Sequence, residues 1–157
     1  MATDEQKKVN QYRLMSMALT GLASGVWNTL GDSAFAFSGP MGNQILGTME
    51  REMGLEIAGE SPVDVMVEIG RIFVDEFGFA SNITVEEVGD EHFEIRVHNC
   101  INRRYTDELV AAGVEKPFIC PILNACQASL RRMNFRMRED VEKWVEGNGS
   151  IITFKGI

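Results

Sequence analysis

The chain has few cysteines and no excess of positive charge. Its 157 residues include three cysteines, an odd number that argues against a disulfide framework and favours a reducing, cytoplasmic setting. There are 15 Lys and Arg residues against 23 Asp and Glu residues, which gives a net charge of −8. A nucleic-acid-binding protein usually has a basic surface, so we expect no nucleic-acid partner. The length suits one domain, which we assign to residues 1–157.

A hydrophobic run long enough to cross a membrane is also lacking. Residues 14–31 carry no charge, but serine, threonine and asparagine interrupt the run, and Gly21 and Gly25 dilute it. We therefore expect a buried helix here and no membrane span. Its apolar residues recur at helical spacing, at Leu14, Met15, Ala18, Leu19, Leu22 and Val26.

Helical signals fill the first half of the chain. One long helix is predicted over residues 5–30, and a second helical region over 33–53 is divided at Gly39-Pro40, with Pro40 in a first helical turn. Ser61-Pro62 opens a further amphipathic helix that Gly78 ends.

The second half mixes strands with helices. Apolar and polar residues alternate over 83–97 around a turn at 89–91, and over 137–155 around a turn at 147–149, which predicts two β-hairpins. Between them, Thr106 or Asp107 starts a short helix that Gly113 ends, and a longer helix spans 122–133. The predicted fold class is α+β, with N-terminal helices packed on a four-stranded antiparallel sheet made of the two hairpins.

The order of elements and three short motifs resemble the 4-vinyl reductase-like, or hydrocarbon-binding, domains over about Leu14 to Phe154. The motifs are Val97-His98-Asn99-Cys100, Pro117-Phe118-Ile119-Cys120, and Arg138-Glu139-Asp140-Val141-Glu142 leading into Gly147. The aminothiazoline-carboxylate hydrolase-like family is a competing assignment.

The resemblance implies a homodimer with an apolar pocket between helices and sheet. It also implies a fold shared with acyl-carrying subunits of a vesicle-tethering complex and with bacterial sensor domains for aromatic compounds. Some sensor members bind zinc through the cysteine that matches Cys120, a glutamate, and two cysteines of the last hairpin. Here Trp144 and Ile151 or Ile152 stand near those two positions, so that zinc site is not expected.

The thiols and histidines leave two chemical alternatives open. His98, Cys100, Cys120 and Cys126 are four candidate ligands for a soft metal, but no CxxC pair exists and we assign no metal site. Cys120 precedes Pro121 at a predicted helix start, where the helix dipole would lower its pKa, so a Cys120–His98 couple could act as nucleophile and base. If neither alternative holds, we expect Cys100 and Cys126 to be small buried residues and His98 to be a half-exposed residue of its strand.

Apolar residues of the helices are the preferred functional candidates. We predict a small hydrophobic molecule bound without catalysis by the chain itself, in a pocket lined by Trp27, Phe35, Phe37, Met41, Phe73 and Cys120. No catalytic residue and no cofactor are assigned. The alternatives are a cysteine-dependent enzyme of the hydrolase-like or reductase-like kind, and an interaction subunit that uses the small-residue face of the first helix.

Overall fold

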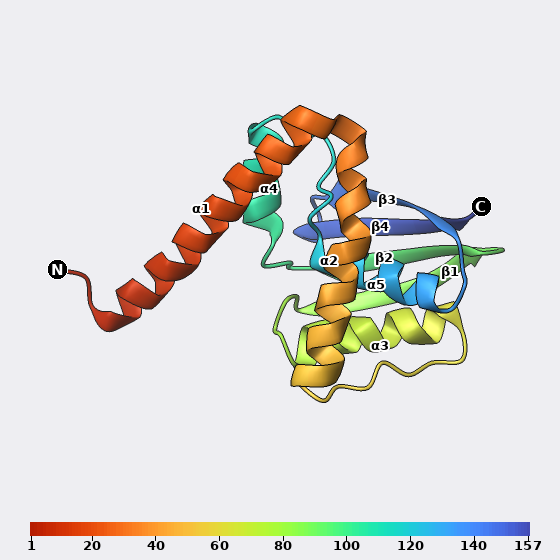
Figure 1. Ribbon diagram of the computed structural model, residues 1–157. Coiled ribbons are helices and arrows are strands. Elements are labelled where there is room, and N and C mark those ends of the chain that lie inside the picture. The colour runs from red at the N-terminus through yellow and green to blue at the C-terminus, as the bar shows by residue number, and fades with distance from the viewer.

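The computed structural model describes residues 1–157, the whole of the chain. The helices are α1 (Asp4–Leu30), α2 (Ser38–Gly47), α3 (Pro62–Asp75), α4 (Arg103–Ala111) and α5 (Pro121–Arg132), and the strands are β1 (Asn82–Gly89), β2 (His92–His98), β3 (Met137–Trp144) and β4 (Gly149–Gly156). A 3₁₀ segment, η1 (Gly31–Phe37), joins α1 to α2, and a π-helical turn, η2 (Thr48–Glu52), follows α2. Figure 1 shows these elements as one body with a projecting α1.

The four strands form one antiparallel sheet in the order β1-β2-β4-β3, so the two hairpins meet through β2 and β4. The register pairs Ile95 of β2 with Val85 of β1 and with Ile152 of β4. Val141 of β3 faces Ile152 from the other side. The predicted α+β fold, with two hairpins joined in one sheet, is confirmed.

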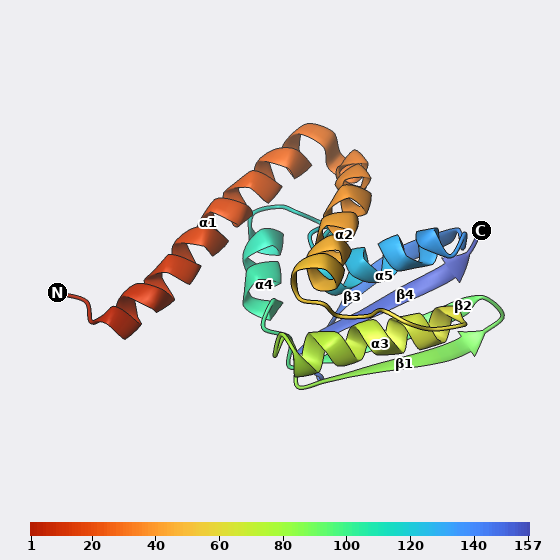
Figure 2. The same ribbon diagram turned by 60° about the horizontal axis from the view of Figure 1, so that its bottom comes forward.

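Helices α3 and α5 cover one face of the sheet, as Figure 2 shows. The inward side chains of the central strands, Phe93, Ile95, Ile152 and Phe154, are almost fully buried there. They form the main core with the apolar faces of the two helices, Ile69 and Leu123 among them. Burial of these alternating residues on one sheet face is the physical reason for the period of two in the sequence.

The predicted helix starts are largely confirmed. Ser61 caps α3, because its hydroxyl accepts a hydrogen bond from the N–H of Asp64 at 3.2 Å, while the Asp64 carboxylate accepts one from the N–H of Ser61 at 3.0 Å. The region over 33–53 divides between Phe37 and Ser38, slightly before the predicted break at Gly39-Pro40, and Pro40 lies in the first turn of α2 as predicted. Helix α4 begins at Arg103, earlier than the predicted start at Thr106 or Asp107.

Helices α2 and α5 cross closely at Gly42. A Cβ atom added to Gly42 would lie 2.1 Å from the backbone oxygen of Asn124 and 2.8 Å from the Cβ of Ala128. Only a glycine therefore permits this approach, and it fixes the position of α5 against α2.

The expected burial of the run 14–31 is wrong. Helix α1 packs on the body through a stripe other than the leucine-rich one. On this stripe Ala23 and Trp27 are buried, and Ser16 and Thr20 are partly buried. Small side chains on that stripe let α1 lie close to the body, and Thr20 donates a hydrogen bond to the Ser16 carbonyl at 2.9 Å. The leucine-rich stripe points to solvent, and the N-terminal part of α1 projects as an arm (Figure 1). None of the helices combines the length with the hydropathy that a membrane-spanning segment requires.

A second, smaller core lies where α1 meets the body. Trp27 stacks on Phe118 with ring centroids 6.2 Å apart, and Ala34, Tyr105, Leu109 and Val114 complete the cluster. This core fixes α4 and the segment that leads to α5, and so positions the site described next.

Candidate ligand-binding site

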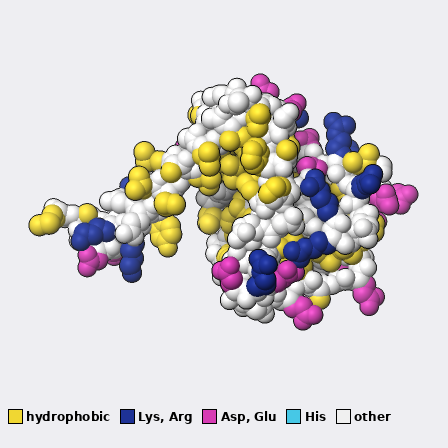
Figure 3. Space-filling model, in the orientation of Figure 1, with side chains coloured by type: hydrophobic (Ala, Val, Ile, Leu, Met, Phe, Trp, Pro, Cys, Tyr) yellow, Lys and Arg dark blue, Asp and Glu magenta, His cyan; other side chains and the backbone are white.

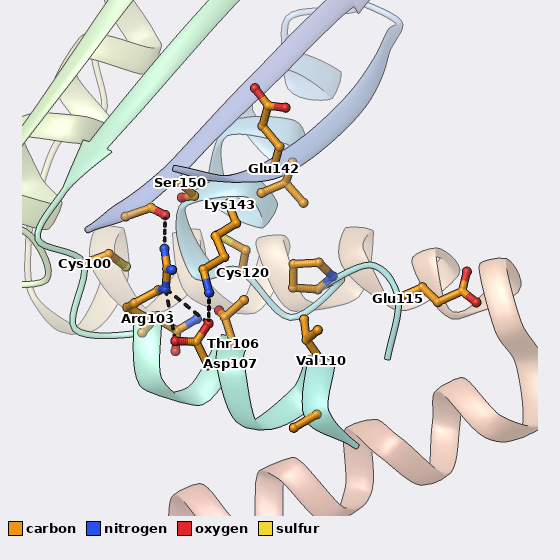
Figure 4. A pocket seen from close by; sticks show the side chains of 15 residues that line it. Cys100, Arg103, Thr106, Asp107, Val110, Glu115, Cys120, Glu142, Lys143 and Ser150 are labelled. Atoms are coloured by element: carbon orange, nitrogen blue, oxygen red, sulfur yellow. Dashed lines mark hydrogen bonds and ion pairs between the residues drawn. The ribbon is translucent and has the colours of Figure 1, made fainter. Parts of the chain in front are cut away.

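A pocket of about 510 Å³ lies between α4, the start of α5 and the end of the β3–β4 hairpin. Figure 4 shows it from close by. Its lining combines apolar residues, two thiols and a group of charged side chains. The residues that line it are Cys100, Asn102, Arg103, Thr106, Asp107, Val110, Ala111, Glu115, Pro117, Cys120, Val141, Glu142, Lys143, Gly149 and Ser150.

The β3–β4 turn is fixed against the segment that follows β2. The N–H of Asn99 donates to the carbonyl of Gly147 at 2.9 Å, and the N–H of Cys100 donates to the carbonyl of Asn148 at 3.2 Å. Gly149 approaches β2 so closely that an added Cβ would lie 1.8 Å from the Val97 oxygen. The glycine-rich turn thus brings the hairpin end beside Cys100 and the first residue of α4.

Arg103 connects α4 to that hairpin. Its side chain is only 13% exposed, and Nη1 donates to the carbonyl of Gly149 at 2.9 Å. Its Nε contacts both carboxylate oxygens of Asp107 at 3.2 Å, one helical turn later on α4. Asp107 also accepts a hydrogen bond from Lys143 of β3 at 2.9 Å (Figure 4). These contacts hold the helix and the hairpin together at one end of the pocket.

Two thiols lie on the lining, at Cys100 and Cys120. Cys120 is the N-cap residue of α5, and burial raises its pKa to about 12, although hydrogen bonds from the N–H groups of Leu123 and Ile122 partly oppose this. Burial also raises the pKa of the Cys100 thiol, against the opposing effects of backbone N–H groups and the charge of Arg103. Both thiols are therefore protonated near neutral pH.

The expected lowering of the Cys120 pKa is therefore wrong, because desolvation outweighs the helix N-terminus. A nucleophilic cysteine needs a substantial thiolate fraction, which this environment does not give. The proposed base, His98, packs edge-on against Trp144 with ring centroids 4.6 Å apart. His98 is half-buried on its strand, as expected.

The candidate metal ligands do not form one cluster. Cys126 lies fully buried in the main core, as expected, whereas Cys100 is only partly buried. No group of three or more His, Cys, Asp or Glu side chains lies together in a way that could hold a metal ion.

The opposite part of the lining is apolar. Val110 and Ala111 of α4, Pro117 of the following segment and Val141 of β3 contribute it. Glu115 and Glu142 extend away from the Arg103–Asp107–Lys143 group in Figure 4. A pocket of this kind can take an apolar molecule and orient it by one polar end.

Of the six residues predicted to bind a ligand, the structure places Cys120 on this lining. Trp27, Phe35 and Met41 belong to the second core, around Phe118. Phe73 lies in the main core, edge-on to Phe79, and Phe37 is exposed on η1. The six residues are thus not brought together, and a ligand-binding role for them stays a prediction.

The residues that sequence reasoning missed are Arg103, Asp107 and Lys143. Arg103 and Asp107 are four apart, a spacing that suggests an ion pair on one helix face, and this signal was present in the sequence. Lys143 gave no comparable signal, because its partner is 36 positions away and depends on the docking of α4 against β3.

The fold and this site define an α+β domain with a pocket beside its last hairpin. The chain belongs to the family described as "Putative rubredoxin C-terminal domain", whose profile matches residues 13–157. No curated protein matches the chain. The resemblance to 4-vinyl reductase-like domains stays a prediction.

A rubredoxin-type iron does not fit the residues of this chain. A sulfur-only tetrahedral iron site takes four cysteine thiolates. The chain has three cysteines, and one of them, Cys126, is enclosed in the main core. We therefore assign no iron ligands in this chain, whatever the family description suggests.

Proposed function

We propose that the protein binds a small, largely apolar molecule in the pocket between α4 and the β3–β4 hairpin, without catalysis by its own side chains. The observation that carries the proposal is the pocket itself. Its volume of about 510 Å³ falls within the roughly 300–1,000 Å³ typical of small-molecule sites. The resemblance to hydrocarbon-binding domains supports the same function.

The lining favours a ligand with an apolar body and one polar group. Val110, Pro117 and Val141 offer apolar contact, and the neutral thiols of Cys100 and Cys120 add to it. At the other end, Arg103 and Lys143 share the single carboxylate of Asp107, so this group carries one positive charge more than negative. A hydroxyl, carbonyl or carboxylate would be oriented towards it.

Methyl NMR with 1-naphthoate as the probe tests this proposal. We expect shift changes at the Val110 and Val141 methyl groups and none at Val88, which lies near the tip of the first hairpin. Val110→Trp would fill part of the pocket and abolish the changes at Val141. Val88→Trp is the matched control, because Val88 and Val110 are similarly exposed, at 48% and 52%. Shift changes confined to other sites, or none at all, would refute the proposal.

The cysteine-dependent enzyme is the weaker alternative, because the raised pKa of Cys120 disfavours nucleophilic attack. The interaction subunit is disfavoured in its predicted form, because Ser16 and Thr20 of the small-residue face lie on the stripe of α1 that packs on the body, whereas the exposed face of the arm is the leucine-rich one. We also propose that the protein is a cytoplasmic homodimer. The three unpaired thiols support the cytoplasmic location. The resemblance to hydrocarbon-binding domains supports the homodimer.

A further inference from the structure

The face of α1 that points away from the body is strongly apolar and lacks a partner. Leu14, Met15 and Leu22 are 65%, 69% and 64% exposed, and Leu19 is 41% exposed. Figure 3 shows hydrophobic side chains along the arm and a broader group of them on the body beside it. An isolated helix in water is marginal, and such a stripe on a helix normally faces a core.

Two glycines on the same side of α1 have no explanation within the chain. A Cβ added to Gly21 or Gly25 would meet nothing within 4 Å. Glycine inside a helix costs about 1 kcal/mol relative to alanine, so its presence usually has a packing reason. The space beside these two residues suits the close approach of a second helix.

We propose that the outer face of α1, defined by Leu14, Met15, Ala18, Leu19 and Leu22, packs antiparallel on the same face of a second copy of the chain. This inference deepens the proposed homodimer and is independent of the ligand pocket. The buried stripe of α1, with Ala23 and Trp27, lies on the other side of the helix. Two arms can therefore meet face to face with both bodies on the outside.

The face complements itself when the twofold axis passes at Ala18. Leu14 and Leu22 lie equally far from Ala18 along the chain, so each leucine meets the other across the interface. Gly21 and Leu14 lie on the same flank of this face, three and four residues from Ala18 in opposite directions, so the open space at Gly21 adjoins Leu14 of the other copy. A self-complementary surface of this kind is what a twofold dimer requires.

Charge favours the same antiparallel alignment. The last turn of α1 has no basic residue, so the partial negative charge of its carbonyl end is not compensated by a side chain of its own. The alignment at Ala18 brings Lys8 of one copy beside that last turn of the other, while Lys7 is paired with Asp4 of its own helix at 3.0 Å. A lipid surface is a poorer occupant, because the net charge of −8 opposes anionic membranes.

The area is also adequate for a dimer. With 27 residues α1 is about 40 Å long, and half the girth of a helix about 11 Å across gives roughly 700 Å² on each partner. A standard-size interface buries about 800 Å² on each partner.

Sedimentation velocity over a concentration series tests the inference. We expect the wild-type chain to be a dimer, and Leu14→Glu and Leu22→Glu each to weaken it by about a hundredfold or more, since each change counts twice at a twofold interface. Met17→Glu is the matched control and should stay dimeric, because Met17 is equally exposed, at 67%, but lies on the flank of the arm. Ala18→Cys should form a covalent dimer on mild oxidation, and Met17→Cys should not.

The other outcomes separate the two proposals. A dimer that persists in both glutamate variants would refute the α1 interface and leave the homodimer standing. A monomeric wild-type chain would refute both, and its co-sedimentation with phosphatidylcholine vesicles would identify lipid as the occupant instead. Ligand binding is measured separately, by the Val110 and Val141 methyl shifts in the monomeric variant.

Discussion

The crossing of α2 and α5 at Gly42 gives the sharpest test of the fold, through the substitution Gly42→Ala. The new methyl group would lie 2.1 Å from the Asn124 backbone oxygen, whereas a carbon and a carbonyl oxygen in contact are normally about 3.3 Å apart or more. The two helices would have to separate by roughly 1 Å. Because the obstacle is backbone in a packed core, no side chain can rotate to relieve it.

The expected cost follows from two opposing effects. Overpacking costs about 1–3 kcal/mol, and a backbone obstacle puts this case at about 3 kcal/mol. The higher helix propensity of alanine offsets about 1 kcal/mol of this destabilisation. The variant should therefore lose about 2 kcal/mol of unfolding free energy, equivalent to a Tm lower by about 4–8 °C for a domain of this size.

Urea unfolding followed by far-UV circular dichroism measures this difference directly. The midpoint should fall while the slope stays unchanged, which shows that stability alone has altered. Ala128→Gly added to the variant should restore little, because the Asn124 oxygen still blocks the methyl group. A change below about 0.5 kcal/mol, or a gain in stability, would refute the close crossing.

Three further outcomes follow from the site and from the start of α3. Arg103→Met should cost about 2 kcal/mol in urea unfolding, because the Gly149 carbonyl loses a charged donor at 2.9 Å; an unchanged midpoint would contradict that bond. Iodoacetamide should label Cys120 slowly at pH 8 and faster as the pH rises towards 12, whereas rapid labelling at neutral pH would disprove its burial. Hydrogen bonds from Ser61 lower the pKa of Asp64 below 3.8. The stabilisation that ionised Asp64 contributes is therefore complete above pH 3.8 and is lost as the pH falls through the pKa of the folded state. NMR titration of the Asp64 carboxyl should show the lowered pKa in the wild type and a smaller shift in Ser61→Ala.

The fold class was predictable because local signals agreed with the tertiary structure. Ser61 and Asp64 cap α3 as their spacing indicates, and alternation in residues 93–97 matches one buried and one solvated sheet face. The start of α4 was less predictable, because Asn102 makes no side-chain cap there. The first residue of α4 is Arg103, which is held by a hydrogen bond to the Gly149 carbonyl in the distant hairpin.

The candidate site was predictable only at Cys120. Large apolar residues such as Trp27 and Phe73 carry the same sequence signal whether they fill a core or line a pocket, and the structure puts these two in cores. Lys143 meets Asp107 only because two separate elements dock. Composition and periodicity contain no information about that contact.

The leucine-rich stripe of α1 shows what apolar periodicity measures. The pattern at Leu14, Met15, Ala18, Leu19 and Leu22 predicted a covered face, yet the body of the chain packs on the opposite stripe, around Ala23 and Trp27. Periodicity indicates that a helix has an apolar face, and it does not indicate what covers that face. The stripe that the fold leaves exposed, beside glycines with open space around them, is therefore the surface on which we propose that a second copy of the chain packs.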